Sequence, residues 1–250
     1  MAGEIFDNRG RGDAGWRMPS IHPEGRRFGL IALGVALFLL LVLDWELLGW
    51  PVLALAIGIF AFFRDPERVV MRDDDLILSP ADGQVIRIEQ VTPPRELVDD
   101  DGGGVSGLNG EAATRISIFM SVFDVHINRA PIGGTVRRVV YMPGRFLNAE
   151  LDKASSENER HHILIERADG RKIGFTQIAG LVARRIVPWV KTGDMLAAGQ
   201  RVGLIRFGSR VDIYLPGGTD PAVLIGQRVI AGETILARFG HQELIEGVLQ

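Results

Sequence analysis

Two long apolar runs near the N-terminus constrain the fold of this chain more than any other feature. The first run extends from Phe28 to Leu43 and the second from Leu47 to Phe63, with Asp44-Trp-Glu46 between them. Each run is slightly shorter than the roughly 20 residues that cross a bilayer comfortably. Two uncharged runs this close together are unusual in a soluble core. The sequence therefore predicts a hydrophobic helical hairpin that anchors the chain to a membrane.

Charged residues beside these runs predict how the anchor lies. Arg26 and Arg27 precede the first run, and Arg64 and Arg68 follow the second. Arginine is enriched on the cytoplasmic side of membrane segments, which puts both ends of the hairpin on that side. We therefore expect a cell-membrane protein with its remaining residues on the cytoplasmic face. Whether the hairpin crosses the bilayer or dips into it as a re-entrant anchor stays open.

After the anchor, the sequence pattern becomes that of β-structure. Short apolar segments separated by glycine and proline turns continue from Leu76 onward, which is typical of a mainly β domain. The segment Thr192–Gly203 is nearly repeated by Gly226–Ile235, and such tandem short strands resemble the barrel-sandwich hybrid of biotinyl and lipoyl carrier domains. The predicted organisation is a disordered polar tail (residues 1–22), a membrane anchor (23–68) and a β-rich domain (69–250).

Composition argues against several kinds of site. The chain has no cysteine, which removes disulfides, thiolate metal sites and cysteine nucleophiles. A formal net charge of -3 argues against a nucleic-acid partner, because such proteins are strongly basic. His161 and His162 are adjacent, so on a strand they face opposite ways and make a poor metal pair. We expect no metal site.

The stretch from Gly203 to Pro216 combines strand patterning with candidate chemistry. Apolar residues alternate on both sides of Gly208-Ser209, and a Gly-Ser pair between strands is ordinarily a turn or bulge. A chemical interpretation competes with this one. Gly208 has no Cβ, so the Ser209 hydroxyl could approach the Gly208 carbonyl and convert the amide to an ester. Elimination and hydrolysis would then leave a pyruvoyl group at a new N-terminus.

A resemblance to a known family bears on this choice. From about Pro23 to about Arg238 the chain resembles the phosphatidylserine decarboxylases in their short membrane-associated form. The order and spacing of five blocks carry the resemblance: Phe63-Arg-Asp-Pro-Glu-Arg68, Ser79-Pro-Ala-Asp-Gly83, Phe119-Met-Ser-Val-Phe-Asp-Val-His126, Asn158-Glu-Arg160 and Phe207-Gly-Ser-Arg210.

The resemblance implies a self-cleaving, pyruvoyl-dependent enzyme. Serinolysis between Gly208 and Ser209 would leave a large chain (residues 1–208) and a small chain (209–250) associated as a heterodimer. Ser209 would become the covalent pyruvoyl cofactor. That group would form a Schiff base with the amine of phosphatidylserine and act as the electron sink while CO2 leaves. The product would be phosphatidylethanolamine, formed at the membrane surface.

The resemblance also implies roles for Asp82 and His126. Both would serve with Ser209 in the manner of a Ser-His-Asp triad. Without the family, the ordinary interpretation is that Asp82 is a turn residue that caps its own backbone and that His126 is a structural histidine. Long-form relatives carry a second histidine three residues after the first, where this chain has Arg129. The self-cleavage base is therefore open: His126 does both jobs, or Asp82 acts with a water.

Two arginines are weaker candidates for binding the substrate, and two other classes of function stay open. Arg129 and Arg210 are candidates for the lipid phosphate, and a structural arginine is the competing interpretation for each. One other class is a membrane-anchored carrier or adaptor, for which Lys191 beside Gly193 is a poor modification site. The last is a serine hydrolase that uses Ser209 without self-cleavage, although the chain lacks Gly-x-Ser-x-Gly.

Overall fold

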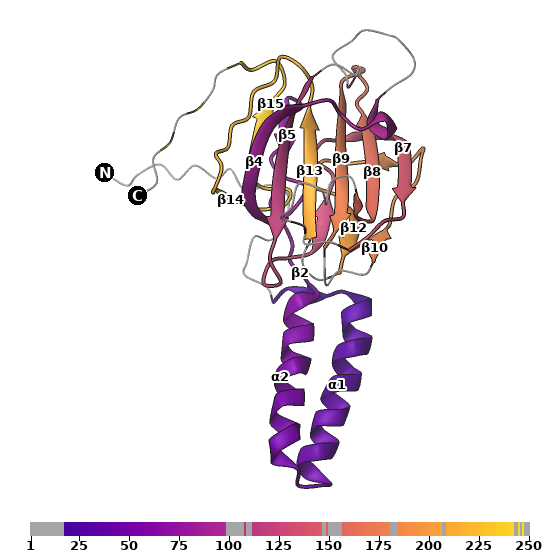
Figure 1. The fold of residues 1–250 in the computed structure, drawn as a ribbon, viewed down its shortest axis with the longest axis vertical. Coiled ribbons are helices and arrows are strands. Elements are labelled where there is room, and N and C mark those ends of the chain that lie inside the picture. Colours follow the sequence, from indigo (N-terminus) through magenta and orange to yellow (C-terminus); the bar gives the residue numbers. More distant parts are fainter. Residues whose placement is uncertain are drawn as a thin grey trace, which may run out of the picture.

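The computed structural model describes residues 18–98, 108, 112–146, 149, 157–180, 185–206, 209–242, 245 and 247. Two parts follow one another along the long axis (Figure 1): a hairpin of two helices and a mainly β domain. Helix α1 covers Pro23–Leu41 and helix α2 covers Glu46–Phe62. The predicted β-rich character is confirmed.

Residues near its first turn explain where helix α1 begins, and a glycine explains how closely the two helices pack. The His22 ring accepts a hydrogen bond from the Glu24 amide, and Pro23 occupies the first turn, where its missing N–H costs nothing. Gly29 lets α2 approach, because a Cβ there would lie 2.4 Å from the Phe60 ring.

Within the described residues, no helix combines the length and the apolarity that crossing a membrane requires.

The hairpin is joined to the β domain by several contacts. Strand β1 (Ser20–Ile21) pairs with β2 (Arg64–Asp65), so these two residues of the segment predicted as a disordered tail form a strand. Glu24 of α1 binds the Arg206 guanidinium at 2.6 Å. At the end of α2, Phe62 and Phe63 pack in one apolar cluster with Val125, Ile127 and Leu204 of the β domain.

The β domain is built from antiparallel strands in three sheets. The eight-stranded sheet has the order β11-β7-β8-β9-β13-β5-β4-β14, a second sheet β10-β12-β6, and a third β15-β3. The bounds are β3 Leu76–Leu78, β4 Gly83–Val91, β5 Ala113–Met120, β6 Ile127–Arg129, β7 Gly134–Met142, β8 Arg160–Glu166, β9 Lys172–Ala179, β10 Ile186–Pro188, β11 Met195–Leu196, β12 Arg201–Ile205, β13 Ser209–Leu215, β14 Arg228–Val229 and β15 Ile235–Arg238, with the short 3-10 helix η1 at Arg95–Leu97.

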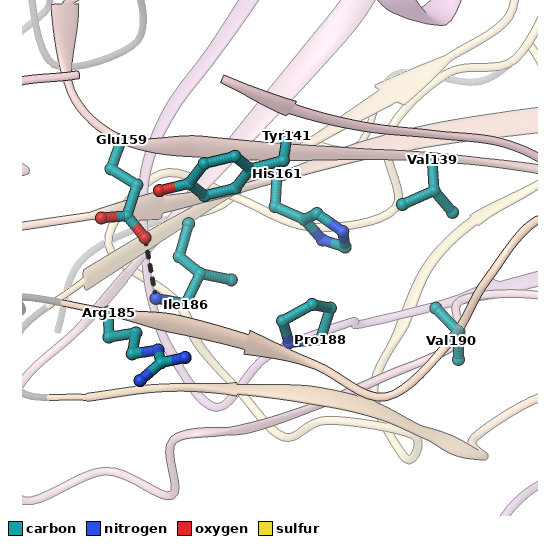
Figure 2. Close-up of a pocket in the computed structure, with 8 residues that line it drawn as sticks. All are labelled: Val139, Tyr141, Glu159, His161, Arg185, Ile186, Pro188 and Val190. Atoms are coloured by element: carbon teal, nitrogen blue, oxygen red, sulfur yellow. Dashed lines mark hydrogen bonds between the residues drawn. The ribbon is translucent and has the colours of Figure 1, made fainter. Parts of the chain in front are cut away.

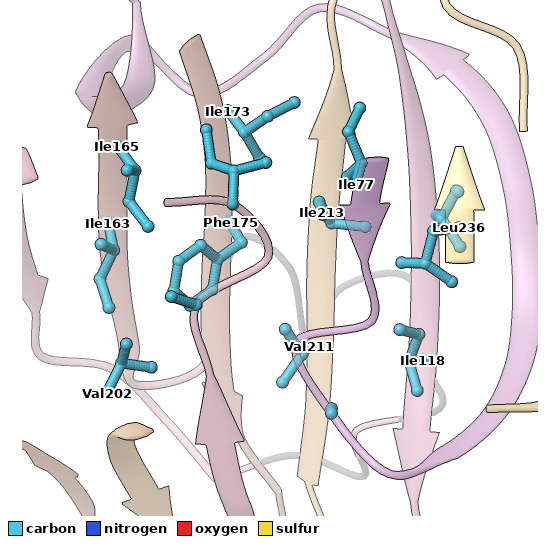
Figure 3. Packing of buried hydrophobic residues seen from close by; sticks show 14 of the residues in the cluster. Ile77, Ile118, Ile163, Ile165, Ile173, Phe175, Val202, Val211, Ile213 and Leu236 are labelled. Carbon is cyan, nitrogen blue, oxygen red and sulfur yellow. The ribbon is translucent and has the colours of Figure 1, made fainter. Parts of the chain in front are cut away.

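The main core lies on one face of the large sheet. Alternate residues of neighbouring strands point into it, as Figure 3 shows for Ile163 on β8, Phe175 on β9 and Val211 on β13. Residues of β13 between these core positions, including Arg210 and Asp212, point to the opposite face, because side chains alternate along a strand. Burial of this alternating apolar set fixes the register of the sheet.

The β domain contains an internal duplication. Ser79-Pro-Ala-Asp-Gly-Gln-Val85 before and within β4 matches Ala130-Pro-Ile-Gly-Gly-Thr-Val136 before and within β7. The two segments bind each other reciprocally: the Leu78 amide donates to the Pro131 carbonyl and the Arg129 amide donates to the Pro80 carbonyl, both at 2.9 Å.

The near-repeats Thr192–Gly203 and Gly226–Ile235 occupy equivalent positions around the two Pro-containing segments. The Gly199 amide donates to Ala130 and the Gly232 amide donates to Ser79, each at 2.8 Å. Likewise β11 pairs with the start of β7, and β14 with the start of β4. The domain therefore has a two-fold-like frame. Asp82 has no counterpart in the second segment, because the matching residue there is Gly133, which has no side chain.

Replacing Gly83 with alanine is expected to destabilise the β domain. A Cβ at Gly83 would lie 2.1 Å from the Phe119 carbonyl oxygen, so β4 must move away from β5. We expect a loss of about 1–3 kcal/mol, as for other overpacked sites, seen as a melting temperature several degrees lower. Gly217→Ala is the control, because a Cβ there meets nothing within 4 Å. Equal melting curves for the two variants would contradict the close approach.

Candidate active site

Ser209 is the first residue of the central strand β13. It pairs with Met120 of β5 on one side and with Ala179 of β9 on the other, and its side chain is fully buried on the core face. Its hydroxyl contacts the Met120 thioether, with 3.3 Å between Oγ and Sδ. Phe207 and Gly208, and with them the predicted cleavage bond, lie outside the described residues.

His126 is a buried, neutral imidazole at the base of the hairpin. Its Nδ1 lies 3.0 Å from the Asp124 carbonyl oxygen, which can only accept, so Nδ1 carries the proton and Nε2 the lone pair. The ring packs against Phe62 of α2, with 4.3 Å between centroids. Burial lowers the pKa of His126 to about 4. The backbone carbonyl of His126 accepts from the Ile205 amide, four residues before Ser209.

Asp82 has a largely buried carboxylate, 13% exposed, that is bound by residues from other parts of the chain. Its oxygens accept from the Arg68 guanidinium at 2.6 Å and from the Ala231 amide at 2.8 Å. Burial raises the pKa of Asp82, while Arg68 and the Ala231 amide act in the opposite direction. These partners contradict the simpler interpretation that Asp82 caps its own turn.

The fold brings the three predicted residues to one end of β5. Gly83, next to Asp82, abuts the Phe119 carbonyl; Met120 pairs with Ser209; and His126 follows six residues later. Their orientation differs from a simple Ser-His-Asp triad. A backbone carbonyl orients the His126 ring, and the Asp82 carboxylate is held by Arg68 and Ala231.

Several residues beyond the predicted ones shape this site. The Asp124 carboxylate accepts from the amide and the hydroxyl of Ser121, each at 2.8 Å, and pairs with the Arg228 guanidinium. It thereby fixes the turn that carries His126. Arg68 and Asp124 lie inside the sequence blocks that carry the family resemblance, so the sequence could have marked them as candidates. Arg228 lies in the repeat Gly226–Ile235, where nothing in the sequence pattern sets it apart.

A chain of buried polar groups leads from Ser209 to a pocket. The Asn128 amide nitrogen contacts Met120 Sδ at 3.6 Å, its oxygen accepts from Gln177 at 2.7 Å, and Gln177 Oε1 lies 2.8 Å from His161 Nδ1. His161 lines a pocket of about 530 Å³ between β8 and β10, as Figure 2 shows. The other lining residues are Val139, Tyr141, Glu159, Arg185, Ile186, Pro188 and Val190.

The two candidate phosphate-binding arginines are buried and bind protein groups. Arg129 donates to the carbonyls of Gly199 and Pro66, each at 2.9 Å. Burial lowers its pKa to about 10, so it stays charged at neutral pH. Arg210 is fully buried on the face of β13 opposite Ser209, where it forms a two-pronged ion pair with Asp212 at 2.7 and 2.8 Å. This geometry favours structural roles for both.

The site is therefore built around a buried serine at the first residue of a central strand in a mainly β domain. Residues 55–237 match the family model described as phosphatidylserine decarboxylase. Proteins named phosphatidylserine decarboxylase proenzyme are similar to the whole chain: 67% identical in Novosphingobium aromaticivorans (100% of this chain and 99% of the relative) and 62% in Erythrobacter litoralis (100% of both). The relative from Zymomonas mobilis is 54% identical over 91% of this chain and 90% of its own.

This chain belongs to the phosphatidylserine decarboxylase family. The family model covers all five blocks completely, and it includes Asp82, His126 and Ser209. The match therefore covers the whole site described above.

Acidification is expected to weaken the fold through its buried histidines. Burial lowers the pKa values of His126 and His162 from 6.5 to about 4, so the unfolded chain binds more protons between these values. The free energy of unfolding should fall as the pH drops from 6.5 toward 4, by on the order of 1–2 kcal/mol per histidine at pH 5.

Urea unfolding of the wild type and of His162→Gln at pH 7 and pH 5 checks this. His162 is the better test position, because it lies on the face of β8 opposite the site, hydrogen-bonded to Thr176. The variant should lose less stability between the two pH values than the wild type. An equal loss would contradict the assigned cause.

Proposed function

We propose that this chain cuts itself between Gly208 and Ser209 and then decarboxylates phosphatidylserine to phosphatidylethanolamine, with a pyruvoyl group made from Ser209. Family membership and the proenzyme names of its relatives support the activity. The observation that carries the proposal is the position of Ser209, buried at the first residue of a central strand. Cleavage just before a strand leaves the new terminus held by the sheet.

The surroundings of Ser209 fit the proposed group. A pyruvoyl cap has no more non-hydrogen atoms than the serine it replaces, so it needs no additional space. The side chain of Ser209 contacts the apolar Met120 thioether, and the amide of Asn128 contacts the same sulfur. When present, the group withdraws electrons from the carbon that loses CO2. No metal ligand is required for this chemistry.

His126 is the proposed proton carrier for both stages. Its depressed pKa keeps the ring neutral at pH 7, with the lone pair on Nε2, so it can take the Ser209 proton. The same ring can return a proton to the substrate carbon after CO2 leaves. Asp82 is already bound by Arg68 and the Ala231 amide. We therefore give Asp82 an electrostatic part in the site and His126 the proton transfer.

The two proposed chains would stay together after cleavage. The small chain (209–250) would contribute β13, which pairs with β5 over seven residue pairs and with β9 over six. All seven residues of β13 are buried. Separating the chains would expose that surface and break both ladders, so we propose a stable heterodimer.

The helical hairpin is the proposed membrane anchor, with the site on the cytoplasmic face. Large apolar side chains are exposed along both helices, including Phe28, Leu41, Leu47 and Ile57, and exposed apolar surface of this extent marks an interaction site. A diacyl lipid leaves a bilayer only at about 0.8 kcal/mol per CH2 exposed. Because Phe62 contacts His126, the proposed anchor begins at the site and spares the substrate that cost.

The duplicated units also support a barrel-sandwich-hybrid architecture for the β domain. The β11–β12 and β14–β15 segments bind equivalent backbone groups of the two halves. Such a fold also serves carrier proteins, which is the adaptor alternative. The other alternative, a hydrolase that uses Ser209 without self-cleavage, predicts an uncut chain and is not supported by the proenzyme names of the relatives.

Ser209→Ala is expected to remain one intact chain without decarboxylase activity, because the attacking hydroxyl and the cofactor precursor are both lost. Intact mass of the purified protein and CO2 release from phosphatidylserine measure the two effects. Ser117→Ala is the matched control, since Ser117 is a buried serine of β5 that faces away from the core. The control should be cut and active. A Ser209→Ala protein that decarboxylates lipid would overturn the proposal.

His126→Gln and Asp82→Asn are expected to separate the two candidate bases. Loss of a general base slows a reaction by roughly 100-fold or more, so His126→Gln should accumulate uncut chain. Asp82→Asn should keep the Arg68 contact and process faster than His126→Gln. Timed intact-mass measurements after synthesis compare the rates. Normal processing of His126→Gln would instead assign the base to Asp82.

A further inference from the structure

The turn between β5 and β6 carries two exposed apolar side chains. Val122 is 48% exposed and Phe123 is 83% exposed, and we call this pair the Val122–Phe123 tip. Turns are usually formed by polar residues and glycine. An aromatic ring held in solvent three residues before His126 indicates a contact with something outside the chain.

The tip is held in this outward position by the surrounding polar groups. Asp124 accepts from the amide and hydroxyl of Ser121, which closes the turn on itself. Arg64 Nη2 donates to the Phe123 carbonyl at 2.5 Å. The backbone on both sides of the two apolar side chains is therefore fixed, so they are preorganised for a partner and their ordering costs little on binding.

The tip lies at the end of the β domain from which the hairpin extends. Arg64, two residues after the end of α2, binds Phe123, while Val125 packs in one cluster with Phe62 and Phe63. Figure 1 shows the loop that follows β5 beside the base of the two helices. The exposed apolar surface of the hairpin is thus continued by the tip.

Basic side chains lie at the same end. Arg26 and Arg27 are exposed on the first turns of α1, and Arg228, which is exposed, pairs with Asp124 beneath the tip. Arg64 lies between α2 and the tip. Apolar side chains next to arginines suit the interface of an anionic bilayer, where rings enter the acyl boundary and cations meet phosphates.

We propose that the Val122–Phe123 tip inserts into the interface of an anionic lipid bilayer as a second contact beside the hairpin. A single hairpin lets the domain tilt about its base, whereas two separate contacts fix its orientation. The tip thereby holds His126 at the plane of the headgroups. This consequence for catalysis rests on the proposed decarboxylase function, whereas the docking itself does not.

The absence of cysteine permits a direct test with one environment-sensitive fluorophore. The full-length Phe123→Cys protein, labelled with a nitrobenzoxadiazole, is mixed with vesicles of phosphatidylcholine containing phosphatidylglycerol. The emission should shift to the blue, and doxyl groups on the lipid chains should quench it. Met195→Cys is the matched control: Met195 is also 83% exposed but pairs with Thr135, at the end of β7 far from the hairpin.

Turnover gives the second readout. The double variant Val122→Ser, Phe123→Ser is compared with Met195→Ser on phosphatidylserine in vesicles and on monodisperse short-chain phosphatidylserine. The ratio of vesicle to short-chain turnover should fall on the order of tenfold for the tip variant only, which corresponds to losing part of one buried aromatic contact.

Two outcomes would contradict the docking of the Val122–Phe123 tip, and a third would contradict the decarboxylase function. Unchanged emission at position 123 with vesicles overturns the docking. A blue shift without vesicles that grows with protein concentration identifies a second copy as the occupant and also overturns it. If the label responds to vesicles but the wild type turns over neither substrate, the docking stands and the decarboxylase function fails.

Discussion

The hydrogen-bonded ladders on both sides of β13 are the constraint on which the rest of the structure depends. β13 runs between β5 and β9 in the middle of the large sheet, and its core face contributes Val211, Ile213 and Leu215 to the main cluster. A strand in this position cannot shift without disrupting both neighbours. Its first residue, Ser209, is therefore held in place by the sheet. The proposed self-cleavage is intramolecular, and fixed placement of the Ser209 hydroxyl would lower its entropic cost further.

The duplicated frame explains how a small β domain can carry an asymmetric site. The two Pro-containing segments bind each other through equivalent backbone contacts. In one of them Asp82 brings a carboxylate where the other has Gly133, and Arg68 from the segment after α2 neutralises it. Removing either partner would leave an uncompensated buried charge. The hairpin therefore contributes to the electrostatics of the site through the residues that follow it, beyond any role at a membrane.

Apolar and ionic contacts make the hairpin and the candidate site one structural unit. Phe62 touches the His126 ring, and Glu24 binds Arg206, three residues before Ser209. Burial keeps the imidazole neutral, and Phe62 is one of the groups packed against the ring. A change at the base of the hairpin is thus transmitted directly to the groups that surround Ser209.

The sequence by itself determined the two helices, the mainly β character, and Ser209, Asp82 and His126 as the residues of interest. Long apolar runs, alternation and compact motifs are local properties, so they can be recognised without coordinates. Only the tertiary structure decided what those residues contact. Arg210 follows Ser209 directly, yet strand alternation and a buried Asp212 place it on the opposite face. Arg129 occupies the position of a histidine in long-form relatives, yet it binds Gly199 and Pro66. Partners of this kind come from distant segments, as in the bond between Asp82 and Ala231, which are 149 positions apart. Only the packing of the whole chain brings segments so distant within hydrogen-bonding range.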